Sequence, residues 1–158
     1  MSEMKKAMPL LAVNEGVWDG YYRYTDPEGN KIDEHKSRLV CRFPEQGPYP
    51  YHQTNHYTWA DGRTDVRDFP ATYRDGRMWF DNDLIYGWAA EVALDDFNRT
   101  LMLNWTRKGE PDLYLYEMIQ LSDCRRYRSR IWQWIKGGKI HMRTLIDEEK
   151  VSDSWEGY

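Results

Sequence analysis

Short extended runs separated by turn-forming clusters recur along the chain about every dozen residues. Aromatic and β-branched runs alternate with Asp-Gly, Gly-Gly and Pro-containing breaks, and this hairpin chemistry makes successive strands antiparallel neighbours. The runs cover residues 16–24, 37–43, 51–59, 63–73, 77–80, 84–94, 99–106, 113–121, 125–135 and 139–151. Nine or ten strands at this spacing are typical of an all-β sandwich or barrel.

An antiparallel meander of this length either exposes two strand edges or closes on itself. Closure removes the edges, so the sequence predicts an all-β antiparallel up-and-down β-barrel of about 8–10 strands. Within the N-terminal segment 1–13, residues 2–12 are expected to form one short helix that plugs an end. The tail 152–158 has no pattern, and is either loose or folded back. At 158 residues, the chain 1–158 is predicted to be a single domain.

Aromatic residues make up 15% of the chain, with eight Trp and twelve Tyr. A domain of this size cannot place all of them in a dry core, because each indole N–H and phenol O–H needs a partner. Some of these rings are therefore expected to line a cavity or groove. The net charge is only −4, which argues against nucleic acid as the main partner.

The two cysteines, Cys41 and Cys124, have neither the spacing of a zinc site nor that of a redox pair. A disulfide between them stays open. The opening residues lack a signal peptide, and no run approaches the roughly 18 apolar residues that cross a bilayer. We therefore expect a cytoplasmic protein with reduced thiols and no membrane partner. No phosphate loop or dinucleotide fingerprint is present, so no cofactor is expected.

Two histidines four residues apart, His52 and His56, raise the question of a metal site. In a strand they share one face but lie about 13 Å apart, at about 3.3 Å per residue. Two ligands of one metal need side-chain atoms within about 4 Å of each other. Because the run 51–59 has little helix propensity, we expect solvent-facing histidines and no metal site. His35 and His141 are isolated and receive no role.

The other face of the run 51–59 carries Gln53, Asn55, Tyr57 and Trp59. If this row of rings and amides points inward, it has the make-up of a small-molecule pocket, which is mostly apolar with a few placed polar groups. The alternative is that the row faces solvent or ties neighbouring strands together. We favour the pocket, because the face with Thr and His suits water better. The remaining residues of the predicted ligand-binding set are Tyr22, Tyr24, Trp88 and Trp105.

Two carboxylates are candidates for a general base. Asp81 stands at a strand end and could reach the barrel mouth, although carboxylates at turns are usually only turn formers. Glu117 lies in the run 113–121, which is apolar on both faces. It shares one face with Leu113, Leu115, Ile119 and Leu121, which we call the leucine face. An inward leucine face would make Glu117 a buried carboxylate, and an outward one an ordinary surface charge. One of the two faces must meet an overlying loop, the tail, or a second copy in a homodimer.

The run 125–135 carries Arg126, Arg128 and Arg130 on the face of Trp132 and Trp134. Basic and aromatic residues in a row also occur in nucleic-acid grooves. We instead expect an outer face of the barrel, with the arginines balanced by acidic neighbours and stacked on the Trp rings. Nucleic acid is therefore not expected as a partner.

Gly16, Trp18 and Gly20 form a Gly-x-Trp-x-Gly motif at the start of the first run. This motif, at the head of an aromatic-rich meander, resembles the calycin group of lipocalins, fatty-acid-binding proteins and related lipocalin-like bacterial proteins. The ending 128–151 looks like the closing hairpin of an uncharacterised bacterial lipocalin-like family. The resemblance implies a Trp that closes one end of the barrel and packs against a basic residue of a late strand. The candidates for that residue are Arg128, Arg130 and Arg143. The resemblance brings no catalytic residues.

Three functions fit these observations. The first is an intracellular barrel that binds a small apolar or aromatic metabolite in its lumen. The second is a cofactor-independent isomerase, cyclase or hydro-lyase in the same pocket. There Tyr57 would donate a proton or hydrogen bond to a substrate oxygen, with Gln53 and Asn55 orienting it. Asp81 or Glu117 would act as the base. The third is an interaction protein that docks through its aromatic surface.

Overall fold

Ten strands follow two short helices in the computed structural model of the chain, which describes residues 2–158. The helices are α1 (Glu3–Ala7) and α2 (Pro9–Ala12). The strands are β1 (Gly16–Thr25), β2 (Lys31–Arg42), β3 (Tyr51–Thr58), β4 (Thr64–Arg74), β5 (Arg77–Asp81), β6 (Ile85–Glu91), β7 (Thr100–Arg107), β8 (Leu113–Leu121), β9 (Tyr127–Lys136) and β10 (Lys139–Ser152). Neither helix is long and apolar enough to cross a membrane.

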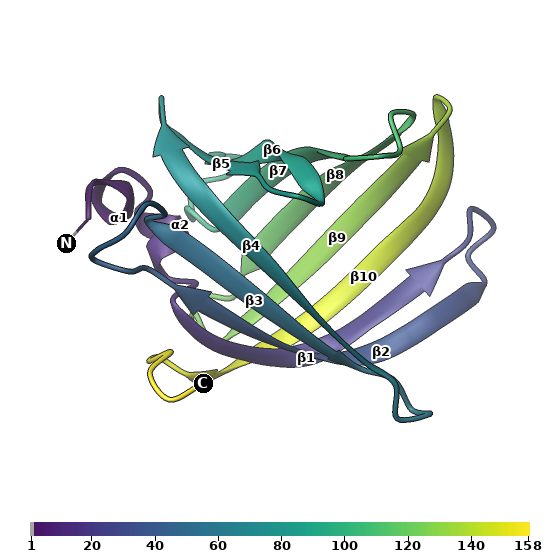
Figure 1. Cartoon of the computed structure of the whole chain (residues 1–158), viewed down its shortest axis with the longest axis horizontal. Coiled ribbons are helices and arrows are strands. Elements are labelled where there is room, and N and C mark those ends of the chain that lie inside the picture. Colours follow the sequence, from purple (N-terminus) through teal and green to yellow (C-terminus); the bar gives the residue numbers. More distant parts are fainter. Residues whose placement is uncertain (1) are drawn as a thin grey trace.

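The strands form one closed sheet. Each pairs antiparallel with its neighbours in the chain, and β1 also pairs with β10. Figure 1 shows them wrapped around a common interior, with the helices at one end and the β1–β2 turn at the other. The prediction of an all-β up-and-down barrel is therefore confirmed, and closure removes the two edges that an open meander would expose.

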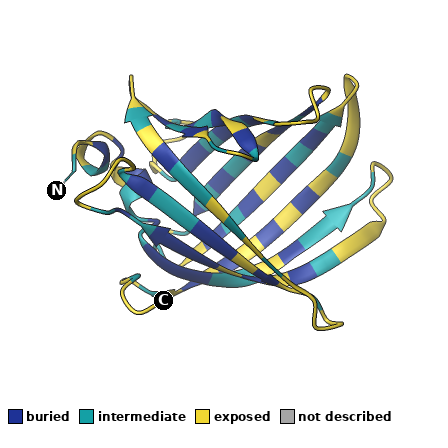
Figure 2. Ribbon diagram, in the orientation of Figure 1, coloured by how far each residue is buried: buried dark blue, intermediate teal, exposed yellow. Residues whose placement is uncertain are grey.

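Burial alternates along the strands, because successive side chains point to opposite faces of the sheet (Figure 2). In β8 this alternation decides which face is inward. The leucine face, which includes Leu115 and Glu117, is buried, whereas Tyr116, which lies between these two residues in the chain, is 48% exposed. The tyrosine face of β8 therefore lies on the outside of the barrel.

The main difference from the predicted strands is the start of β2. It begins at Lys31, whereas the predicted run begins at residue 37. Residues 31–36 are almost all charged or ionisable and have little strand propensity of their own, but they pair with β1, with His35 opposite Tyr22. This longer strand places His35 on the inner face.

The N-terminal segment forms two helices instead of the predicted one. Pro9 begins α2, where its missing N–H costs nothing, and so separates the two helices. The Glu91 carboxylate at the end of β6 accepts hydrogen bonds from the N–H groups of Leu10 and Leu11, at 2.6 and 2.9 Å. These bonds tie α2 to the barrel, and the Leu10 and Leu11 side chains of α2 are buried.

The tail folds back on the barrel, which was one of the two expected alternatives. Trp155 Nε1 donates to Glu15 Oε1 at 3.2 Å, and Arg42 Nη2 donates to the Tyr158 carbonyl oxygen at 3.2 Å. Both cysteines are free, with Cys41 buried.

The glycines of the Gly-x-Trp-x-Gly motif allow β1 to approach β10 closely. Gly16 has φ of 114°, and a Cβ there would lie 2.1 Å from the Ser152 carbonyl oxygen. A Cβ on Gly20 would lie 2.0 Å from the Asp147 carbonyl oxygen. A larger residue at either position would force the two strands apart.

Trp18 closes the end of the barrel near the helices, as the resemblance implied. It is fully buried, and its Nε1 donates to the Asn14 carbonyl oxygen at 2.9 Å. Of the three candidate basic residues, Arg128 is the partner, with its guanidinium carbon 4.3 Å from the Trp18 ring centroid. Lys150 adds a second cation, with Nζ at 5.3 Å from that ring.

Candidate functional site

The barrel encloses a cavity of about 410 Å³. Rings and aliphatic side chains form most of its wall, including Phe80, Leu101, Leu103, Trp105, Trp132 and Trp134. A few polar side chains interrupt this wall. Small-molecule sites in proteins commonly have this composition.

The two ends of the cavity differ in their access to solvent. Near the helices its wall is made by Leu11, Asn14 and Arg128, all of them buried. At the other end the wall includes Asp33 and Ile32, and the latter is 56% exposed. The cavity is therefore closed beneath the helices and opens at the opposite end.

The predicted row on β3 faces the cavity. Tyr51 Oη donates to Gln53 Oε1 at 2.7 Å, Gln53 Nε2 donates to Asn55 Oδ1 at 2.7 Å, and Asn55 Nδ2 donates to Tyr57 Oη at 2.8 Å. Each amide both accepts and donates, so the row has one fixed orientation. Burial raises the pKa of Tyr57, which keeps its hydroxyl protonated and able to donate.

The opposite face of β3 points outward, as predicted. His56 is exposed, and His52 Nε2 lies 3.6 Å from Asp68 Oδ1 on β4. Across residues 2–158, no three His, Cys, Asp or Glu side chains gather closely enough to hold a metal ion.

His35 belongs to the cavity wall, although no role was predicted for it. Its Nδ1 lies 3.1 Å from the Lys36 carbonyl oxygen, and its Nε2 lies 3.0 Å from Tyr24 Oη. Because a carbonyl oxygen only accepts, Nδ1 carries the proton, and Nε2 accepts from the Tyr24 hydroxyl. The imidazole also packs against the rings of Tyr57 and Trp59, at centroid distances of 4.5 and 4.6 Å. Burial lowers the pKa of His35 below 6.5, so the ring is neutral at pH 7.

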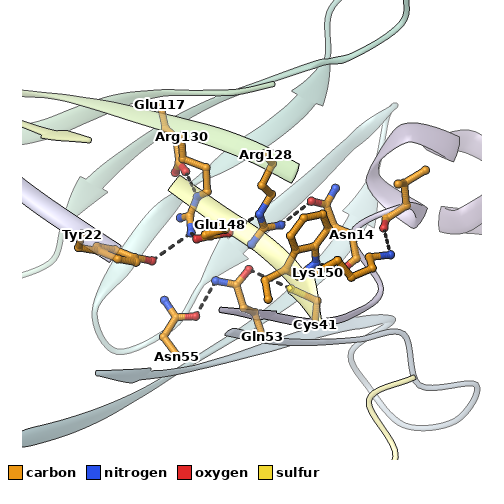
Figure 3. Close-up of polar contacts among 12 residues, drawn as sticks. Asn14, Tyr22, Cys41, Gln53, Asn55, Glu117, Arg128, Arg130, Glu148 and Lys150 are labelled. Atoms are coloured by element: carbon orange, nitrogen blue, oxygen red, sulfur yellow. Dashed lines mark hydrogen bonds and ion pairs between the residues drawn. The ribbon is translucent and has the colours of Figure 1, made fainter. Parts of the chain in front are cut away.

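Four charged side chains from β8, β9 and β10 meet inside the barrel (Figure 3). Arg130 Nε donates to Glu117 Oε1 at 2.7 Å, and its Nη1 donates to Glu148 Oε1 at 2.9 Å. Arg128 Nε donates to Glu148 Oε2, and its Nη1 donates to Asn14 Oδ1. All four charged groups are buried. We call Arg128, Arg130, Glu117 and Glu148 the charged cluster.

Two guanidinium groups balance two carboxylates in the charged cluster. Burial works against the charge of Arg130, but Glu117, the Tyr22 oxygen and Glu148 outweigh it and hold the pKa of Arg130 above its usual value. Arg130 Nη1 also donates to Tyr22 Oη at 3.0 Å. Each carboxylate of the cluster is paired with a guanidinium group, and the formal charges of the four side chains sum to zero.

Six residues of the predicted ligand-binding set line the cavity: Tyr24, Gln53, Asn55, Tyr57, Trp59 and Trp105. Glu117 lines it as well, held by Arg130. Tyr22 is fully buried next to the charged cluster but does not line the cavity. Whether these residues bind a ligand stays a prediction.

Two residues of the predicted site, Trp88 and Asp81, do not line the cavity. In β6 the inner face is taken by the small residues Gly87 and Ala89, which leaves room for Trp105 opposite Gly87 and turns Trp88 outward. Asp81 follows Phe80, which points inward, and it therefore points to solvent, where it pairs with Lys108.

Three arginines, Arg126 just before β9 and Arg128 and Arg130 within it, were predicted on the outer face, and this was wrong for Arg128 and Arg130. Both are 5% exposed and line the cavity, together with Trp132 and Trp134. Only Arg126 is exposed. The two Trp residues of that face were the signal for an inner face, but the carboxylates that balance the arginines come from other strands and could not be assigned from sequence.

The outer surface of β5, β6 and β8 carries a second group of rings. Trp79 and Tyr86 have centroids 6.2 Å apart, and Tyr114 and Tyr116 are 5.6 Å apart. Tyr86 is 45% exposed. A docking partner or the second copy of a homodimer would find apolar area here, and pairing of two copies stays a prediction.

No protein-family model and no curated protein sequence matches the chain. A protein of unknown function from the DUF3598 family of Nostoc punctiforme aligns with a TM-score of 0.67 at 15% identity, over 89% of this chain and 49% of its own. The chain thus spans about half the length of that protein. Rv2717c from M. tuberculosis aligns with a TM-score of 0.62 at 13% identity, over 95% of this chain and 98% of its own. These similarities concern the fold alone, which is a closed antiparallel β-barrel.

Removal of one charge from the charged cluster is expected to destabilise the protein strongly. In Glu148→Gln, two buried guanidinium groups lose a carboxylate partner, and the free energy of unfolding should fall by about 3 kcal/mol. The neighbouring Asp147 is the matched control, since it pairs with Arg23 on the surface and its side chain is 73% exposed. Asp147→Asn should cost less than about 1 kcal/mol. Urea denaturation measures both, and equal losses would contradict the assignment.

The stability of the protein is expected to fall with pH because of His35. Its pKa is below 6.5 in the folded state, so the unfolded chain binds the proton first, and protonation favours unfolding. The stability that the neutral ring provides is present above pH 6.5 and is lost as the pH falls through the folded pKa. Urea denaturation at several pH values should therefore show wild type losing stability relative to His35→Gln as the solution is acidified. A difference that stays constant or grows would be inconsistent with a buried neutral imidazole.

Proposed function

We propose that the protein binds a small apolar or aromatic metabolite inside its barrel. The observation that supports this most directly is the unfilled cavity, about 410 Å³ in volume and walled by rings and aliphatic side chains. Ligand sites usually have volumes of about 300–1,000 Å³. A lumen filled by its own side chains would instead have favoured docking through the outer rings.

The polar groups of the wall support selective binding. The hydrogen-bonded row from Tyr51 to Tyr57 presents a fixed set of donors and acceptors on β3, and His35 with Tyr24 presents another near the mouth. Groups that are already oriented lose little entropy when a ligand binds. A ligand would thus gain affinity from the apolar wall and orientation from these groups.

Filling the cavity should abolish ligand binding. Ala89 lines the cavity in β6, whereas its neighbour Ala90 lies on the outer face opposite Met102. Ala89→Phe adds a ring to the space that the ligand would occupy, and Ala90→Phe adds the same ring outside. Native mass spectrometry for a retained ligand and equilibrium dialysis with 2-ethylnaphthalene should show binding by wild type and Ala90→Phe, and at least tenfold weaker binding by Ala89→Phe.

Circular dichroism and thermal unfolding of both variants check that the barrel is intact. If Ala89→Phe is folded and binds as well as wild type, the ligand does not enter the cavity. If Ala90→Phe alone loses binding, the outer rings are the binding surface, and the proposal fails.

A cofactor-independent isomerase, cyclase or hydro-lyase is the second candidate. The hydrogen bond between Tyr24 and the neutral His35 favours it, because a buried imidazole base joined to a hydroxyl at a cavity wall can relay a proton. Tyr57 would donate a hydrogen bond to a substrate oxygen. Glu117 is less suited as the base, since Arg130 already holds its carboxylate.

Proton transfer can be tested on the retained ligand itself. In deuterated buffer, an enzyme of this kind should introduce deuterium into the ligand at a rate that His35→Gln and Tyr57→Phe reduce at least tenfold. Incorporation at the rate of the free compound, with affinity unchanged, would leave binding as the function.

We further propose a cytoplasmic location, which the two free cysteines support. Membership of the uncharacterised bacterial lipocalin-like family is likewise a proposal, supported by the Gly-x-Trp-x-Gly motif and the closing hairpin of β9 and β10.

A further inference from the structure

The outward side chains of β6, β7, β8 and β9 form a surface without charge, which we call the uncharged face. These strands are neighbours in the sheet (Figure 1). Along these four strands, which the structure describes completely, no outward side chain is acidic or basic. The outward side chains of β2, by contrast, include Glu34, Lys36 and Arg38. Charged residues make up 30% of the chain, so their absence from four neighbouring strands sets this side of the barrel apart.

The uncharged face has the composition of an interface centre. Met102 on β7 pairs in register with Met118 on β8, and Met118 with Ile131 on β9, which gives an apolar row across three strands. The adjacent row consists of a phenol between two amides, at Asn104, Tyr116 and Gln133. Centres of protein interfaces are rich in Tyr, Trp and Met and poor in Lys, Glu and Asp.

Paired charges of both signs border the uncharged face at its two ends. At the closed end of the barrel, Arg99 Nε donates to Asp95 Oδ2 at 2.9 Å, in a shallow hollow that Tyr127 also lines. At the open end, Lys108 pairs with Asp81. A polar rim around an apolar centre is the usual anatomy of an interface. Because each end carries an acid beside a base, a second copy of the same surface meets no net repulsion there.

The size of the uncharged face is that of a dimer interface. Strands lie about 4.8 Å apart and rise about 3.3 Å per residue, so these four strands have a footprint of roughly 500 Å². The rings and methionines that stand up from it, and the exposed Leu94 and Phe97 of the adjoining loop, enlarge the accessible area. The total is on the order of the 800 Å² that each partner of a stable complex buries.

A second copy of this chain is the partner that fits this surface best. Complementary charge selects unlike partners, and the uncharged face offers none. An amide both donates and accepts, so Asn104 and Gln133 can bond to the same groups of an identical face. Two-fold interfaces require such self-complementarity, and homodimer interfaces are more apolar than those between unlike proteins.

We propose that two copies of the chain associate through the uncharged face as a two-fold symmetric dimer. Tyr116 and Ile131, both exposed in the single chain, lie in the buried centre of this interface. The pairs of Arg99 with Asp95 and of Lys108 with Asp81 stay at its rim, in contact with water. The dimer uses outward side chains and the cavity inward ones, so this inference does not depend on the proposed function.

A charge placed at the centre of the uncharged face should weaken the dimer. Tyr116→Lys puts an ammonium group between two amides, and Tyr21→Lys is the matched control, because Tyr21 on the outside of β1 is 42% exposed and Tyr116 is 48% exposed. Sedimentation equilibrium at micromolar concentration should give twice the chain mass for wild type and Tyr21→Lys. Tyr116→Lys should associate at least tenfold more weakly, as expected for a residue at an interface centre. Both variants bring the net charge of −4 closer to zero, so added overall repulsion cannot cause this loss.

The same measurement in concentrated salt tests the chemistry of the interface. In about 1 M NaCl, charges are screened beyond about 3 Å, whereas apolar contacts are retained. Wild type should therefore remain a dimer. Dissociation in salt would assign the association to ion pairs elsewhere on the surface and overturn the proposal.

Methionine methyl NMR of wild type decides if circular dichroism shows that Tyr116→Lys does not fold. Met102 and Met118 lie on the uncharged face, whereas Met78 and Met142 line the cavity. Dilution that dissociates the dimer should shift the methyl resonances of Met102 and Met118 and leave those of Met78 and Met142 in place. Dissociation without a shift at Met102 or Met118 would place the interface elsewhere.

Two further results would overturn the dimer. One is a wild-type protein that sediments as a monomer at micromolar concentration, and the other is a dimer that folded Tyr116→Lys retains or that Tyr21→Lys loses. Neither result bears on the proposed function, which is tested by ligand binding. Loss of ligand binding in Ala89→Phe, in turn, leaves the dimer untouched.

Discussion

Glu148 accepts hydrogen bonds from Arg128 and Arg130 at once, and the closed end of the barrel depends on this interaction. Through these arginines it joins β10 to β9, to Glu117 on β8 and to Asn14 beyond α2. Arg128 in turn stacks on Trp18, whose flanking glycines let β1 approach β10. A buried cluster of this kind is stable only when each charge is paired, so its members specify one arrangement of this end.

The same cluster explains why the cavity lies where it does. Long charged side chains and the short helices occupy the end near Trp18, while rings and aliphatic side chains form most of the cavity wall. Small inner residues such as Gly87 and Ala89 leave space that Trp105 fills only in part. The polar row of β3 and His35 then supply the few oriented groups of an otherwise apolar chamber.

Period-two alternation was enough to predict the barrel, the inner row of β3 and the outward His56. It also restricted β8 to two alternatives, which the structure resolves in favour of an inward leucine face. It failed where the inner residues are charged. The start of β2 reads as a polar loop, so His35 was missed, although counting back in twos from Cys41 and Leu39 reaches it.

Arg128 and Arg130 were placed outside for a related reason. An arginine is acceptable inside a barrel only if a carboxylate meets it there, and Glu117 and Glu148 lie on other strands. Their contact depends on strand register, which the local sequence of β9 does not contain. Trp88 was misplaced because two small residues flank it, and only the packing of Trp105 against Gly87 shows which face of β6 is inward.

In the proposed function, the rings inside the barrel, and not those outside it, meet a small molecule. Fluorine NMR of protein labelled with 5-fluorotryptophan tests it directly, because the chain has eight Trp residues on both sides of the sheet. On titration with 2-ethylnaphthalene, the resonances of Trp105, Trp132 and Trp134 should shift together, and those of Trp79 and Trp88 should stay in place. Shifts confined to Trp79 and Trp88 would contradict the account and assign recognition to the outer face.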